Sequence, residues 1–157
     1  MSTLSELTRK ADYIASRNHQ LKSQWHCYQN SLIQAVKSLN KKINHEFIGG
    51  VDDDLRFELF NHFTIRIQLS DDFFSHEITY SLNVAPAGEA PRFTPFAHAT
   101  LSEQGCIDQI PVRDKAAVLD HYLNKIFAIY QCLFEALQAD KPIYTQLEKW
   151  LVPTAVR

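Results

Sequence analysis

The amino-terminal part of the chain places the strongest constraint on the fold. Its first 48 residues contain neither glycine nor proline, the two residues that most disfavour a helix interior. Thr3 and Glu6 have the spacing of a capping box, which marks a helix start. Apolar residues then recur in alternating steps of three and four, which is the spacing of a heptad seam: Leu4, Leu7, Ala11, Ile14, Leu21, Trp25, Tyr28, Leu32, Ala35 and Leu39. We therefore expect one long helix over about residues 3–43, ending before Gly49-Gly50.

A helix of this length constrains how the rest of the chain packs. About 40 residues at 1.5 Å per residue span roughly 60 Å. A chain of 157 residues is most simply one domain, so we expect residues 1–157 to fold as a single domain narrower than this helix is long. Part of the helix must then project, kink or pair with another chain.

One position of the seam is polar, and its flanks are basic. Asn18 stands where an apolar residue is expected, and a polar residue there costs stability but can set register or oligomeric state. In a parallel homodimer Arg17 of one chain would face Lys22 of the other, and the two like charges would repel. Packing against a later helix of the same chain, an antiparallel homodimer and an acidic partner all remain open.

The hydrophobic period changes to two after the acidic run 52–54, which is typical of antiparallel strands with one buried face. We expect a sheet of four to five strands over about residues 54–111. The interval 60–62 is either a tight turn or a bulge in one long strand, and the interval 85–95, with three of the six prolines, is a loop. The expected strands are 55–59, 63–69, 78–84, 97–101 and 107–110.

Two further helices are expected after the strands, over about residues 114–138 and 143–151, with Asp114 as an N-cap. The apolar residues of the first cover more than half of its circumference, which indicates burial on two sides. The sheet and the long amino-terminal helix are the obvious covers. The expected fold class is thus α+β: a long N-terminal helix, an antiparallel sheet and a C-terminal helix packed on it.

Composition and charge point to a cytoplasmic globular protein. The chain is 45% hydrophobic and 22% charged, it begins without the apolar segment of a signal peptide, and no apolar run approaches membrane-spanning length. Three cysteines without a C-x-x-C pair fit a reducing compartment. Residues 1–50 carry seven Lys/Arg against three Asp/Glu, a balance of +4. Such asymmetry indicates a nucleic acid or an acidic protein partner, or simply a solvated helix face.

The sequence shows no constellation of reacting groups. Phosphate-binding glycine loops and a nucleophile elbow are both absent. The seven histidines lack metal-ligand spacing, although His62 and His76 could approach each other across the sheet. The basic residues of the first helix are spread rather than bunched, so direct DNA binding is not expected. We therefore expect no catalytic, cofactor-binding or metal-binding residue and no enzyme activity.

Several motifs of the chain resemble one known family. They are "ADYIASR" from Ala11, "L-x-x-QWH-x-Y-x-NSL-x-Q" from Leu21, "LFNHF-x-I-x-x-x-L", "SH-x-I-x-Y", "GCID" and "RD-x-x-x-VL-x-HYL-x-KI". Together they are similar to the formate hydrogenlyase regulatory protein family over about residues 11–136. The proline-rich interval 85–95 and the tail from Pro142 depart from the family pattern.

The resemblance implies a regulatory role. Members of that family counteract the sigma-54-dependent, formate-sensing activator of the formate regulon, so the implied mechanism is protein–protein antagonism of this activator. A long basic helix with an apolar seam agrees with this, because such a helix can lie in a groove of another protein. We expect the interaction residues to be Arg17, Asn18, Lys22, Trp25 and His26.

Trp25 has two interpretations, core residue of the seam or, if the end of the seam is free, anchor of an interface. Two other functions also remain open. One is a small α+β assembly or secretion-type chaperone, acting as a dimer that holds a client segment. The other is an enzyme or ligand-sensing domain with a pocket lined by His62, His76 and a carboxylate.

Overall fold

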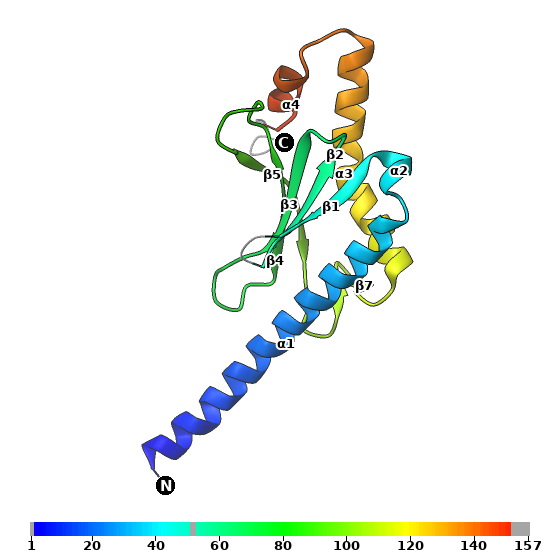
Figure 1. Cartoon of the computed structure of the whole chain (residues 1–157). Coiled ribbons are helices and arrows are strands. Elements are labelled where there is room, and N and C mark those ends of the chain that lie inside the picture. The colour runs from blue at the N-terminus through cyan, green and yellow to red at the C-terminus, as the bar shows by residue number, and fades with distance from the viewer. Residues whose placement is uncertain (1, 51–52, 152–157) are drawn as a thin grey trace.

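The computed structural model describes residues 2–50 and 53–151 (Figure 1). It has the expected α+β class, with a long N-terminal helix, a five-stranded antiparallel sheet and C-terminal helices. In chain order the elements are α1 (Thr3–Lys37), α2 (Asn40–Ile43), β1 (His45–Gly49), β2 (Leu55–Leu59), β3 (Phe63–Leu69), β4 (Glu77–Asn83), β5 (Phe93–Thr100), β6 (Cys106–Ile107), β7 (Ile110–Pro111), α3 (Lys115–Gln138) and α4 (Ile143–Leu151).

The long helix begins at Thr3 as expected, but Ser2 and not Thr3 caps it, and it ends earlier than expected. Ser2 is its N-cap, and the Ser2 hydroxyl accepts a hydrogen bond from the Ser5 amide at 3.1 Å. At the other end the Leu39 amide donates to the Val36 carbonyl at 2.8 Å, a tight turn that closes the helix. The single helix expected over 3–43 is therefore two helices, and the second is only four residues long.

The sheet is a meander in the order β1-β2-β3-β4-β5, with every neighbouring pair antiparallel. Between β2 and β3, Phe60 and Asn61 both have positive φ, 54° and 53°, and the His62 amide donates to the Leu59 carbonyl at 2.9 Å, as in a type I′ turn. The interval 60–62 is thus a tight turn and not a bulge. β5 begins at Phe93, so the loop expected over 85–95 is shorter. Pro95 is accommodated because β5 is an edge strand.

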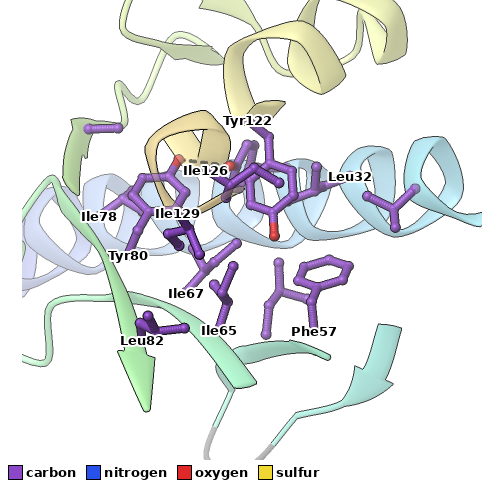
Figure 2. Packing of buried hydrophobic residues seen from close by; sticks show 14 of the residues in the cluster. Leu32, Phe57, Ile65, Ile67, Ile78, Tyr80, Leu82, Tyr122, Ile126 and Ile129 are labelled. Atoms are coloured by element: carbon purple, nitrogen blue, oxygen red, sulfur yellow. Dashed lines mark hydrogen bonds between the residues drawn. The ribbon is translucent and has the colours of Figure 1, made fainter. Parts of the chain in front are cut away.

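The core lies between the sheet and the helices (Figure 2). Phe57, Ile65 and Ile67 point from β2 and β3 toward Tyr122 of α3 and Leu32 of α1, and all five are buried. The alternation of buried and half-buried residues along β2 and β3 is the period-two pattern read in the sequence. α1 supplies core residues only from Leu21 onward.

α3 is covered on one side along its whole length and on the second side only in part. Its buried residues face the sheet, and α1 crosses it near its N-terminal half (Figure 1). In its C-terminal half Phe127, Phe134 and Leu137 remain exposed. Burial by the sheet and α1, as the sequence predicted, therefore holds for the first half of α3, whereas the second half meets α4 instead of α1 and keeps an exposed apolar side.

Candidate protein interface

The first half of α1 projects from the rest of the protein (Figure 1). Every residue from 2 to 16 is exposed. The seam residues of this segment form an exposed row, with Leu4 73%, Leu7 59% and Ile14 50% exposed. We call Leu4, Leu7, Ala11 and Ile14 the α1 stripe. Exposed apolar rows of this kind mark surfaces that meet other molecules.

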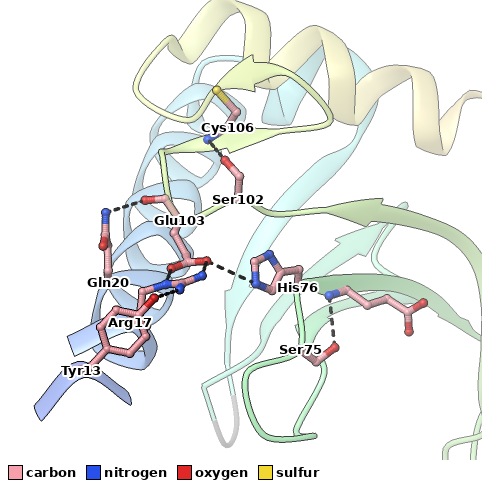
Figure 3. Close-up of polar contacts among 9 residues, drawn as sticks. Tyr13, Arg17, Gln20, Ser75, His76, Ser102, Glu103 and Cys106 are labelled. Carbon is pink, nitrogen blue, oxygen red and sulfur yellow. Dashed lines mark hydrogen bonds and ion pairs between the residues drawn. The ribbon is translucent and has the colours of Figure 1, made fainter. Parts of the chain in front are cut away.

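An ion pair fixes the point where α1 leaves the rest of the fold, which we call the joint (Figure 3). The Arg17 guanidinium donates through Nε to Oε1 and through Nη2, at 2.8 Å, to Oε2 of Glu103. Glu103 is only 5% exposed, and Gln20 Nε2 donates to its backbone carbonyl at 3.1 Å. The hydrogen bonds from Arg17 lower the pKa of Glu103 and those to Glu103 raise the pKa of Arg17, so both groups are charged.

Aromatic and imidazole side chains complete this joint. The Arg17 Cζ lies 5.2 Å from the ring centre of Phe74 and 5.6 Å from that of Tyr13, within the range of cation–π contacts. His76 Nε2 lies 3.7 Å from Glu103 Oε2. Arg17, which the sequence analysis expects to contact a partner, donates to Glu103 and Tyr13 within the chain and so anchors the projecting helix.

The other four residues of the predicted interface separate into two groups. Trp25 is 1% exposed, packs 6.0 Å from Tyr28 ring to ring, and donates from Nε1 to the Asp53 carbonyl at 3.0 Å. The structure thus places Trp25 in the core, because the free part of the seam lies before Arg17. Lys22 and His26 are exposed and Asn18 is half-buried.

The histidines that could serve in catalysis or metal binding each have a separate partner. His62 Nε2 lies within hydrogen-bond distance of the Tyr144 hydroxyl, so His62 and His76 have different partners and do not share a pocket. His45 is buried with Nε2 2.6 Å from the Tyr122 hydroxyl, and burial lowers the pKa of His45 to about 4. Within residues 2–50 and 53–151, no three His, Cys, Asp or Glu side chains gather as metal ligands.

No helix within residues 2–50 and 53–151 combines the length with the hydrophobicity that a membrane span requires. The projecting half of α1 carries polar and charged residues on the faces away from its stripe. Its pattern is that of a helix with one apolar side.

Fold and surface together define the class, an α+β protein with a projecting amphipathic helix. A family model described as a transcriptional repressor of the hyc and hyp operons matches residues 2–148. The formate hydrogenlyase regulatory protein HycA of Escherichia coli (strain K12) is 39% identical over 155 residues, which is 98% of this chain and 99% of the relative. HycA of Shigella flexneri matches to the same extent. The chain belongs to this HycA family of transcriptional repressors, which confirms the resemblance seen in the sequence. No solved structure matches the chain.

Two features of this surface were not found by sequence reasoning. The heptad seam named the stripe residues, but the expected interface was placed further along, between Arg17 and His26. The partner of Arg17 could not be foreseen, because Glu103 lies 86 residues away in a short loop without periodicity. Asn18 is the residue from which this border could have been predicted, because the polar seam position lies between the covered and the free part of the seam.

Proposed function

We propose that this protein represses formate hydrogenlyase expression in the cytoplasm by binding the sigma-54-dependent activator of the formate regulon. The observation that carries the proposal is the α1 stripe, an apolar helix side that the described part of the chain leaves uncovered. Family membership supplies the regulatory role, and the surface suggests contact with protein. In this mechanism the repressor neither touches DNA nor transforms a substrate.

The stripe has the form of a helix that binds in a groove. Its residues are spaced three, four and three apart, the pattern of anchors in helix-in-groove recognition. Full burial of a Leu or Ile side chain is worth about 1.5–3 kcal/mol, so three such anchors supply several kcal/mol of binding free energy. The α1 stripe can therefore contact a partner without any rearrangement of the sheet and the other helices.

Charged residues of both signs lie beside the stripe, and the basic ones favour contact with acidic groups of a partner. Arg9 and Lys10 are exposed on the projecting segment together with Glu6 and Asp12, and Lys22 adds a positive charge further along α1. Complementary charge steers association and fixes register more than it adds affinity. We infer that the stripe supplies the affinity, and that Lys22 and His26 orient the activator against the helix.

Co-purification of the activator with variants of this chain tests the proposal. The variant Leu7→Asp/Ile14→Asp places two charges in the stripe and is expected to weaken activator binding at least tenfold. The control is Ser16→Asp, which adds a charge to an exposed position of the same helix outside the stripe. Equal recovery of the activator with the two variants contradicts the proposal, and recovery of a hydrogenlyase subunit instead favours the chaperone function.

A further inference from the structure

A second apolar surface lies on the C-terminal half of α3. Phe127, Phe134 and Leu137 are 66%, 56% and 63% exposed, and Phe60, at the β2–β3 turn, is 44% exposed. They border a hollow of about 690 Å³ whose lining is almost entirely apolar. We call the surface formed by Phe60, Phe127, Tyr130, Phe134, Leu137 and Ile143 the α3 groove.

We propose that the α3 groove binds the α1 stripe of a second copy of this chain. The two surfaces have the same spacing. Leu4, Leu7, Ala11 and Ile14 follow one another at steps of three, four and three, and so do Phe127, Tyr130, Phe134 and Leu137. Each row spans ten residues, or roughly 15 Å. Rows of equal length and phase can interdigitate along their whole length.

The stripe that fills the groove must come from another molecule. α1 is one uninterrupted helix from Thr3 to Lys37, so it has no hinge that could fold the stripe back. Figure 1 shows the N-terminus of α1 and the C-terminal end of α3 at opposite ends of the protein. A chain therefore cannot cover its own groove with its own stripe, although it carries both.

Charge disfavours pairing of two stripes. In an antiparallel pair with Leu4 opposite Ile14 of the other copy, the two Lys10 side chains lie beside the two-fold axis and repel. The exposed flank of α3 offers Gln131 and Gln138 instead, neutral amides that can accept from Lys10. The stripe is thus better matched to α3 than to itself.

Area disfavours pairing of two grooves. With a full surface of roughly 200 Å² per side chain, the four exposed residues of the groove present on the order of 450 Å². Each partner in a standard interface contributes about 800 Å². A dimer that pairs groove with groove would therefore bury little more than half of that area on each chain. The exposed side chains of the stripe add on the order of 350 Å². Exchange of stripe and groove between two copies reaches the required area.

Light scattering on two variants and on their mixture tests this pairing. The stripe variant is Leu7→Asp/Ile14→Asp and the groove variant is Phe127→Asp/Phe134→Asp. Each alone is expected to raise the dimer dissociation constant at least tenfold, while Ser16→Asp leaves it unchanged. Mixing the two variants is expected to restore association in part, because one of the two stripe–groove contacts of the dimer is then intact. Circular dichroism and thermal melting verify that all variants are folded.

Each other outcome overturns the inference in a recognisable way. A wild-type chain that stays monomeric at high concentration overturns it. A stripe variant that still dimerises alone indicates groove-to-groove pairing, and a groove variant that does so indicates stripe-to-stripe pairing. Activator binding is measured on the same samples, since the proposed function uses the same stripe. A monomeric wild type whose stripe variant loses the activator leaves the proposed function standing, whereas restored association without any activator binding leaves the inference standing.

Discussion

Arg17 and Glu103 form a bidentate ion pair at the point where α1 leaves the body, although they lie 86 residues apart in the sequence. The pair joins the long helix to the loop before β6. Residues 2–16 lie beyond this joint and are exposed, whereas core residues of α1 begin at Leu21. The joint therefore marks the border between the half of α1 that builds the fold and the half that is free to bind.

Removing the carboxylate is expected to loosen this border without unfolding the sheet. In Glu103→Gln the bidentate pair is lost and Arg17 keeps weaker amide partners. Hydrogen exchange is expected to become faster for α1 amides around residues 13–24 and to stay unchanged in β3 and β4. Exchange that is equally fast throughout the chain would mean that Glu103 supports the whole fold and not the joint.

The same variant changes how stability depends on pH. The pKa of Glu103 is lowered in the folded protein by hydrogen bonds from Arg17, so its stabilisation is complete above the unfolded pKa, about 4.3 for Glu. It is lost as the pH falls through the lower, folded value. Glu103→Gln is expected to lack this acid-side loss. Parallel stability profiles for wild type and variant below pH 5 would contradict the assignment.

A second acid-side effect comes from His45. Burial lowers its pKa to about 4, against about 6.5 in the unfolded chain. Between these values the unfolded chain takes up a proton that the folded protein does not, so stability falls as the pH decreases. We expect a loss of about 2 kcal/mol between pH 7 and pH 5. Urea unfolding of wild type and His45→Gln measures it, and an equal loss in both proteins would show that His45 is not the cause.

The sequence predicted the periodic elements and missed those defined by contacts. β2, β3 and β4 alternate over five to seven residues, which is enough to show period two. β1 has five residues after a helical segment, and of its less exposed positions, His45, Phe47 and Gly49, only Phe47 is a large apolar residue. Its strand character comes from pairing with β2, in which His45 lies opposite Leu59. Propensity over five residues cannot foresee such a pairing.

The exposed apolar part of the seam lies nearer the N-terminus than the interaction residues that the sequence analysis expected. The seam correctly indicated that α1 is longer than the body can cover. The sequence did not show which end stays free, because that depends on where the sheet and α3 lie across α1. Trp25 was named for its size, and size is equally useful in a core. The structure resolves this choice through the burial of Trp25 and the exposure of Leu4 and Leu7.

Trp25 and Lys22, three residues apart on α1, are expected to respond in opposite ways. Trp25→Ala removes a buried ring and its hydrogen bond to the Asp53 carbonyl, and should cost about 3–5 kcal/mol of stability. Lys22→Glu changes an exposed residue and should alter stability by less than about 0.5 kcal/mol while weakening activator binding. Thermal melting and co-purification on both variants measure this. A stable Trp25→Ala protein that loses the activator would restore Trp25 as an interface anchor.

The buried hydroxyl pair of Tyr28 and Tyr80 should behave as one unit. Their oxygen atoms lie 2.8 Å apart between α1 and β4, and burial raises the pKa of both phenols. Tyr28→Phe or Tyr80→Phe alone leaves a buried hydroxyl without this partner and should cost about 1–3 kcal/mol. The double variant should cost clearly less than the sum of the two. Additive losses in a double-mutant cycle would mean that the hydroxyl groups do not interact.

Hydrogen exchange of this chain with and without the activator tests the central claim most directly. Below the concentration at which the chain dimerises, the stripe is uncovered in the free protein, so amides of residues 3–16 are expected to exchange rapidly. Addition of the activator is expected to slow them at least tenfold, while the exchange of α3 amides stays unchanged. Binding of the activator that protects another surface and leaves residues 3–16 as fast as before would contradict the account.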